Sequence, residues 1–285
     1  MRVNTALSYI LLTVLAVLFL LPVCVILTNS LMSGFEISNR FGAFVTPENF
    51  YSSVGAAHFA QISLIPDSVT LTQYFDLLFG SAEYIGKFWN SVLLAAPIVA
   101  GQIVVSAPAA YAFEMSRFKF KEIIYFIYIV IMLVPLQVSL VPNYIMAQLL
   151  TINGTRLAII LPGMASPFGV FLIRQHMKNL PRDYVEAAQI DGAGHLRVLI
   201  LIVTPLFKPA VAALFMLSFI ENWNLVEQPV IFLRDIAMEP LSVYLSQIDG
   251  SLIFAASCFY MLPAVLIFLY GQEYMVEGIQ LSGIK

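Results

Sequence analysis

The chain of 285 residues is 60% hydrophobic and only 11% charged, and its mean hydropathy is +0.88. Soluble domains carry about 25% charged residues because water must cover their surface, so this composition excludes an ordinary soluble domain and indicates a surface that mostly faces lipid. The net charge of −3 says little about a partner, since the positive and negative residues gather in different segments.

Six apolar segments follow one another along the chain, each near the length that crosses a bilayer. A helix needs about 20 mainly apolar residues to span the hydrocarbon layer, with about 17–25 workable. We therefore predict an all-α membrane protein with one transmembrane domain over residues 1–285. The six predicted transmembrane helices cover residues 6–30, 88–112, 123–147, 156–175, 202–222 and 252–273.

The first apolar segment allows two interpretations, a membrane helix that is kept or a secretory signal that is removed. A signal peptide has an apolar core of about 7–15 residues, a basic start and a cleavage site with small residues. Here the apolar run is longer, Arg2 is the one basic residue before it, and no A-x-A pattern follows. A retained membrane helix is therefore the favoured interpretation.

Lysine and arginine residues predict the orientation of the helices, because cytoplasmic loops are enriched in them. With the N-terminus inside, the inner segments hold ten Lys and Arg residues and the outer segments hold four. The expected topology therefore has both termini in the cytoplasm.

Two long segments are expected on the outer side. Residues 32–86 contain ten aromatic residues, which favour a membrane interface or a packed cap over a disordered linker. This segment is either a lid over the protein's own helices or a docking surface for an external partner. The second outer segment, residues 222–249, contains Trp223 near its start and is interrupted by Pro229 and Pro240.

The inner loop between the fourth and fifth predicted spans, residues 176–205, carries the most informative pattern in the chain. We expect a short helix that ends at Gly192, because glycine readily adopts the positive φ of a sharp turn. Ala187 and Ala188 are small enough for a partner's backbone to approach closely, and Glu186 offers a carboxylate to a partner arginine. The loop is thus suited to docking, although Glu186 would also fit a purely solvated position near the start of its helix.

The residues of this loop have a specific spacing: Glu186-Ala187-Ala188, three residues, Gly192, nine residues, Ile202, two residues, Pro205. This pattern resembles the inner-loop signature of binding-protein-dependent ABC importer permeases. The likeness extends over nearly the whole chain and is strongest to the carbohydrate branch, in particular to its maltose-type second permease subunit. The other stretches that carry it are Asn90-Ser91, 109–113, 132–135 with Pro142, 168–175, Asn222-Trp223-Asn224 and 278–285.

Three features depart from the family pattern. Leu199 stands where an aromatic residue is usual, and Leu201 stands where a polar or basic residue is common. Both lie in the second part of the inner loop and would alter its contact with an ATPase. Residues 32–86 also form a longer outer segment than the family implies.

The resemblance implies a permease subunit in a prokaryotic plasma membrane that works with a second permease subunit, two ATPase subunits and an external solute-binding protein. ATP and magnesium would be bound by the partner ATPase, so no cofactor is expected in this chain. The outer segment 222–249 would reach toward the binding protein. Asp191 allows two interpretations, and shaping the turn at the end of the short helix is favoured over contact with the ATPase. The residues implied in coupling to the ATPase are Glu186, Ala187, Ala188, Asp191, Gly192 and Pro205.

Four polar residues of the predicted spans allow two interpretations. They either line a polar cavity on the substrate pathway or form hydrogen bonds between helices, which is the commoner use of such residues in membranes. These residues are Tyr111, Asn143, Tyr144 and Gln148.

Enzymatic and ion-coupled functions find little support in the sequence. No G-x-x-x-x-G-K-[ST] motif for ATP is present, the three histidines lack the spacing of metal ligands, and the apolar windows hold almost no ionisable residues for a proton- or sodium-coupled transporter. An importer of the same architecture for a peptide or a polyol is the first alternative. A membrane scaffold that shares only the docking loop is the second.

Overall fold

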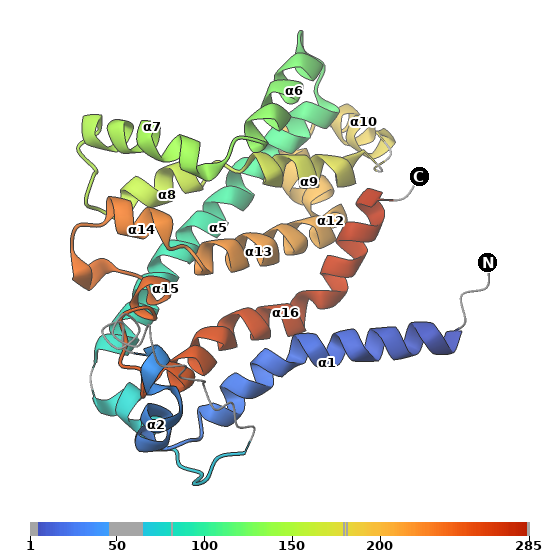
Figure 1. Cartoon of the computed structure of the whole chain (residues 1–285). Helices are drawn as coiled ribbons and strands as arrows, with labels where there is room; N and C mark the ends of the chain where they lie inside the picture. The colour runs from blue at the N-terminus through green and yellow to red at the C-terminus, as the bar shows by residue number, and fades with distance from the viewer. Residues whose placement is uncertain (1–4, 46–64, 81, 179, 181, 284–285) are drawn as a thin grey trace. The chain divides into compact units, whose positions relative to one another are not determined.

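The computed structural model describes residues 5–45, 65–80, 82–178, 180 and 182–283, and it shows helices and no strand in these residues (Figure 1). The predicted all-α fold is therefore confirmed. The α-helices are α1 Thr5–Asn29, α2 Gly34–Val45, α4 Thr72–Phe75, α5 Glu83–Met115, α6 Lys121–Met132, α7 Leu136–Leu149, α8 Leu157–Gly163, α9 Pro167–Met177, α10 Asp183–Ile190, α11 His195–Val198, α12 Thr204–Leu206, α13 Lys208–Trp223, α14 Glu227–Phe232, α15 Leu241–Tyr244 and α16 Ile253–Gly283. Short π-helical segments η1 Asp76–Gly80 and η2 Leu199–Val203 and the 3₁₀ segment η3 Ile236–Met238 join them.

Four helical stretches in the described residues are long and apolar enough to cross a membrane, and the number rises to as many as six if each of two bent helix pairs counts as one span. The four are Leu7–Asn29, Glu83–Met115, Leu157–Met177 and Ile253–Tyr274. The two bent pairs are Lys121–Met132 with Leu136–Leu149, at 101°, and His195–Leu206 with Lys208–Trp223, at 82°.

The two bends differ from the continuous helices that the sequence predicted at 123–147 and 202–222. Pro135 sits between α6 and α7 with an extended ψ of 143°, and the residue before a proline is itself disfavoured in helical conformation. At the second bend Phe207 has φ −114° and ψ 24°, and Pro209 follows in the first turn of α13. At each bend a proline stands at the start of the new helix, where its missing N–H leaves no intrahelical hydrogen bond unmade.

The residues fall into two compact units, one formed by 1–86 and 244–263 and the other by 87–243 and 264–285. In the first unit, Met32, Ile37 and Phe41 are buried against Phe254, and the rings of Phe41 and Phe254 meet edge to face at 5.2 Å. The Arg40 guanidinium lies 3.1 Å from the Glu36 carboxylate and 2.6 Å from that of Asp67. Helix α1 buries none of its apolar window, so its side chains are available to lipid or to another subunit.

The second unit is organised around α9, which contacts both α6 and α13. Ser166 caps α9 by accepting a hydrogen bond from the Gly169 N–H at 3.0 Å. These helices contribute the following buried side chains to the core cluster of this unit: Tyr125, Val170, Leu172, Ile173, Met177, Ala210, Ala213 and Leu214.

Gly169 is a point of close approach between α9 and two neighbouring helices, α5 and α13. A Cβ at this position would lie 2.6 Å from Ser106 Oγ and 3.1 Å from both methyl carbons of Leu214. The absence of a side chain therefore allows α5 and α13 to pack against α9.

Replacing Gly169 with alanine should lower the free energy of unfolding by about 1–3 kcal/mol, the usual cost of overpacking a core. Thermal unfolding of the purified protein in mild detergent measures this effect. Gly86→Ala is the matched control, since no described atom lies within 4 Å of its added Cβ. Equal unfolding temperatures for the two variants would contradict the close approach at Gly169.

Candidate functional site

Helix α10 lies in the inner loop with one side buried and the other exposed. Val185 and Ala188 are 6% and 8% exposed and belong to the core cluster of the second unit. Glu186 and Ala187 lie on the exposed side. The structure thus separates two neighbouring residues of the predicted docking set: Ala187 is open to a partner, whereas Ala188 fixes the helix to the protein.

The end of α10 has the hydrogen bonds of a Schellman motif. The Ala193 N–H donates to the Ala188 carbonyl at 2.9 Å, and the Gly192 N–H donates to the Gln189 carbonyl at 3.0 Å. Gly192 has φ +84°, a conformation that glycine adopts without strain. Asp191 is the exposed C-cap residue immediately before this turn.

The second part of the loop runs through α11, η2 and α12. Val198 and Leu199 are buried in the core cluster, while Leu201 is 61% exposed. Thr204 donates its hydroxyl to the Leu199 carbonyl at 2.7 Å, and Pro205 lies exposed in the first turn of α12. Leu199 therefore contributes to packing, and Leu201 is available at the surface.

A depression of about 510 Å³ lies between α10 and the end of α5. His195 lies beside it, with Nδ1 3.4 Å from the Tyr111 hydroxyl and 3.5 Å from Gln189 Nε2. The lining is rich in charged and polar groups: Met115, Ser116, Arg117, Arg182, Val185, Glu186, Gln189 and His195.

The four predicted pathway residues are not gathered in one place. Tyr111 is 5% exposed and faces His195 of the inner loop. Tyr144 accepts a hydrogen bond from Gln148 Nε2 at 2.9 Å and packs its ring near that of Phe232, at 6.0 Å. Asn143 is half-buried on the same helix, α7. The contacts of Tyr111 and Tyr144 are those of residues that link parts of the fold.

Sequence reasoning missed a polar cluster at the other end of α5, which we call the polar clamp. It consists of Lys87, Asn90 and Ser91 of α5 and Arg156, together with the backbone of residues 236–241. Asn90 Nδ2 donates to the carbonyls of Ala237 and Glu239 at 2.7 and 3.0 Å, while its Oδ1 accepts from Arg156 at 2.7 Å.

Further contacts belong to the polar clamp, including an ion pair of 3.7 Å between Lys87 Nζ and Glu239 Oε2. Lys87 Nζ donates to the Ile236 carbonyl, and the Leu241 N–H donates to Ser91 Oγ at 2.8 Å. Asn90 and Ser91 stood out in the sequence only through their family resemblance, because their partners are backbone groups almost 150 residues away.

The comparison with family models matches residues 102–275 to the binding-protein-dependent transport system inner membrane component. Among curated proteins, the arabinooligosaccharides transport system permease protein AraQ of Bacillus subtilis (strain 168) is 28% identical over 95% of this chain and 92% of its own length. The osmoprotective compounds uptake permease protein GgtD of Synechocystis is 31% identical over 70% of each chain. The sn-glycerol-3-phosphate transport system permease protein UgpE of Brucella abortus is 29% identical over 76% of this chain and 82% of its own.

Among solved structures, a chain of a bacterial ABC transporter that imports the acidic polysaccharide alginate superposes with a TM-score of 0.80, 20% identity and 96% coverage of both chains. A chain of a bacterial alginate ABC transporter in complex with an alginate pentasaccharide-bound periplasmic protein gives a TM-score of 0.55 at 15% identity, covering 87% of this chain and 94% of that one. The fold is therefore that of ABC importer permeases.

The turn at the end of α10 can be tested with two neighbouring glycines. Gly192→Ala should cost about 1–2 kcal/mol, because a Cβ is unfavourable in the left-handed region, and amide hydrogen exchange in residues 188–194 should become about 5–30 times faster. Gly194→Ala is the matched control, since Gly194 has φ −70° and no described atom lies within 4 Å of its added Cβ. Unchanged exchange in Gly192→Ala would contradict the left-handed conformation of Gly192.

Proposed function

Since the chain belongs to the family of binding-protein-dependent transport system inner membrane components, we propose that it is the permease subunit of an ATP-driven importer for an oligosaccharide or a related carbohydrate. The observation that carries this proposal is the match over residues 102–275, which includes the whole inner-loop signature from Glu186 to Pro205. ATP hydrolysis belongs to the partner ATPase, so this chain contributes the membrane pathway rather than an enzyme activity.

The carbohydrate assignment is supported by similarity to proteins named for sugar transport over nearly the whole chain. The match to AraQ extends over 95% of this chain, and the structure with the TM-score of 0.80 comes from an importer of a polysaccharide. Relatives named for osmoprotective compounds and for sn-glycerol-3-phosphate keep a non-sugar solute as the second candidate. A membrane scaffold is disfavoured, because the likeness is not confined to the docking loop.

In the proposed assembly, a second permease subunit and two ATPase subunits join this chain, and ATP and magnesium bind to the ATPases. Helix α10 is the coupling helix, and its exposed Glu186 and Ala187 face the ATPase, together with Asp191 and Pro205. Ala188 and Gly192 hold the shape of the loop, the first by packing and the second by its turn. Alternating access then follows from helices that rock between two packed arrangements.

The proposed topology has six spans, with each bent helix pair counted as one, and both termini in the cytoplasm of a prokaryotic cell. The inner loop 176–205 then faces the ATPase, and the segments 32–86 and 222–249 face the solute-binding protein. Residues 46–64 of the first outer segment lie outside the described residues. The bends at Pro135 and Phe207 would place exposed backbone near the middle of the membrane, where transporters use broken helices to line a pathway.

The coupling assignment predicts the effect of changing the exposed side of α10. Glu186→Ala combined with Ala187→Asp should reduce ATP-dependent uptake by about 100-fold, because an unpaired carboxylate would be buried against the ATPase. Uptake into membrane vesicles and co-purification of the ATPase measure this loss. Lys119→Gln, an exposed change between α5 and α6 and outside the loop 176–205, is the control and should stay within about twofold. Normal substrate-stimulated ATPase activity in the double variant would contradict the assignment.

The carbohydrate assignment predicts what the cognate solute-binding protein binds. The protein encoded next to this chain should bind a neutral or acidic oligosaccharide with a Kd of about 1 μM or lower, equivalent to about −8 kcal/mol. Titration calorimetry against oligosaccharides, peptides and phosphorylated polyols makes the measurement. Binding confined to a peptide or a polyol would overturn the carbohydrate assignment and leave the importer assignment standing.

A further inference from the structure

Helix α5 makes polar contacts at both ends of the stretch that belongs to the second unit. From Lys87 to Met115 it runs about 40 Å at 1.5 Å per residue, and it remains one helix through Pro97 and Pro108 (Figure 1). Leu94, Ile98 and Ala110 are at most 1% exposed. The helix is thus a packed, continuous element between two distant polar groups.

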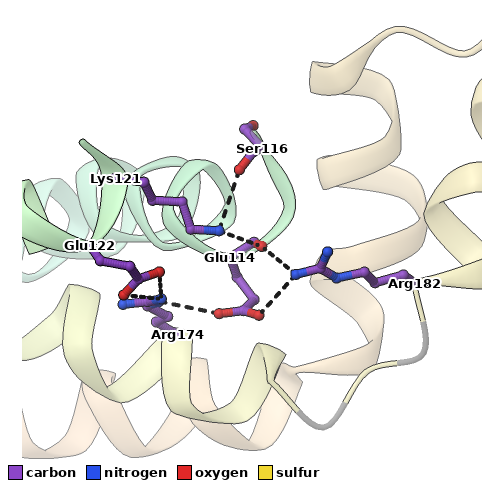
Figure 2. Close-up of polar contacts among 6 residues, drawn as sticks. All are labelled: Glu114, Ser116, Lys121, Glu122, Arg174 and Arg182. Atoms are coloured by element: carbon purple, nitrogen blue, oxygen red, sulfur yellow. Dashed lines mark hydrogen bonds and ion pairs between the residues drawn. The ribbon is translucent and has the colours of Figure 1, made fainter. Parts of the chain in front are cut away.

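At its carboxyl end, α5 meets a buried arginine (Figure 2). Arg174 of α9 places Nε 3.2 Å from Glu114 Oε2 and Nη2 3.1 Å from Glu122 Oε1, while its guanidinium carbon lies 3.7 Å from the centre of the Tyr125 ring. The Arg174 side chain is only 5% exposed. Because a buried guanidinium must keep its partners, this contact firmly joins the end of α5, the start of α6 and the end of α9.

Glu114 also reaches the inner loop. Its second carboxylate oxygen, Oε1, lies 3.7 Å from Nη2 of Arg182, the residue immediately before α10, and the same nitrogen lies 3.4 Å from the Glu114 carbonyl. The Arg182 side chain is 49% exposed, so water competes for it and the contact is weak. One carboxylate therefore makes a firm contact to α9 and a reversible contact to the start of α10.

A second contact joins the same face of α5 to the residues that follow α10. Tyr111 lies one turn before Glu114, and positions three apart share a helix face. The Tyr111 hydroxyl meets His195 Nδ1 at 3.4 Å. Residues on both sides of α10, Arg182 before it and His195 after it, thus contact the last turns of α5.

At its amino end, α5 holds residues 236–241 through the polar clamp. The Asn90 amide group and the Lys87 ammonium donate to three backbone carbonyls in residues 236–239, and Ser91 accepts the Leu241 N–H. Lys87 and Asn90 are 4% and 7% exposed. A displacement of α5 along its axis would therefore also move this segment.

We propose that α5 connects the inner loop to residues 236–241, and that Glu114 is the positioning residue through which α10 acts on α5. The proposal rests on the proposed function of α10 as the coupling helix. When an ATPase displaces α10, Arg182 moves with it and draws on the Glu114 carboxylate. Because the buried Arg174 contact holds that carboxylate in one orientation, the displacement is transferred to α5 and to the polar clamp. Because coupling between two sites is reciprocal, a binding protein on the outer segment influences α10 by the same route.

The test uses the complete importer in nanodiscs, with both permease subunits, the ATPases and the solute-binding protein. Arg182→Glu places two carboxylates together and should lower binding-protein-stimulated ATPase activity by about fivefold or more. Arg182→Lys, which keeps a positive charge beside Glu114 and leaves the buried Arg174 contact intact, should remain within about twofold. Lys119→Gln, which removes a positive charge from the neighbouring turn, is the matched control.

A measurement at the polar clamp, the end of α5 away from α10, shows whether a change at Arg182 is transmitted along α5 or has only a local structural effect. A cysteine at the exposed Ala237, introduced after Cys24 and Cys258 have been replaced with alanine, reports the state of the polar clamp by its maleimide labelling rate. In the otherwise unchanged chain, this rate should change when a nonhydrolysable ATP analogue binds. The change should be lost in Arg182→Glu and return in Arg182→Lys, which needs no substitution at the buried Glu114.

Three outcomes are distinguishable. If the importer with the unchanged chain shows no stimulation by the binding protein, the proposed function fails. If it is stimulated but Arg182→Glu retains both the stimulation and the nucleotide-dependent labelling of residue 237, the connection through α5 is overturned. The connection is also overturned if Arg182→Glu abolishes stimulation while the labelling change persists, since α10 would then act through another element.

Discussion

In hydrocarbon, a backbone N–H or C=O group has no water to bond with, and this constraint governs the architecture of the chain. Within a long helix the backbone N–H and C=O groups bond with one another. At the helix ends, polar side chains bond with the backbone carbonyls that remain. Lys121 Nζ donates to the carbonyls of Glu114 and Ser116 at 3.1 and 3.4 Å, and Gln102 Nε2 donates to that of Gly163 at 2.9 Å. These polar side chains therefore bond with backbone carbonyls at the ends of helices.

The same residues that satisfy the backbone also place the functional segments. Asn90 bonds with the carbonyls of residues 237 and 239 and thereby positions the segment 236–241. Arg174, with its two carboxylates and the Tyr125 ring, holds α9 against the end of α5 and the start of α6, just before the loop that contains α10. In the proposed importer, one set of contacts would both satisfy buried polar groups and couple the two segments. Several of the few charged residues of the chain, which make up 11% of it, lie at the two ends of α5.

Local patterns were sufficient for some features and insufficient for others. The positive φ of Gly192 and the short helix before it follow from local sequence, because a glycine after a helix permits the turn that its last carbonyls need. The opposite orientations of Ala187 and Ala188 were not foreseen, since both are small and either suits a close contact. Tyr111 was considered for the substrate pathway, yet it faces His195, a partner 84 positions away that no local pattern indicates.

By itself, the sequence determined an all-helical membrane protein of the importer permease family, because hydropathy and the inner-loop spacing are properties of neighbouring residues. The tertiary structure alone decided that α6 and α7 are bent by 101° at Pro135, since a proline in an apolar segment is compatible with a kink or with a complete break. It also decided that Glu114 lies between Arg174 and Arg182. Glu114 lies at least 60 positions before both arginines in the sequence. Only packing brings its carboxylate within contact distance of their guanidinium groups.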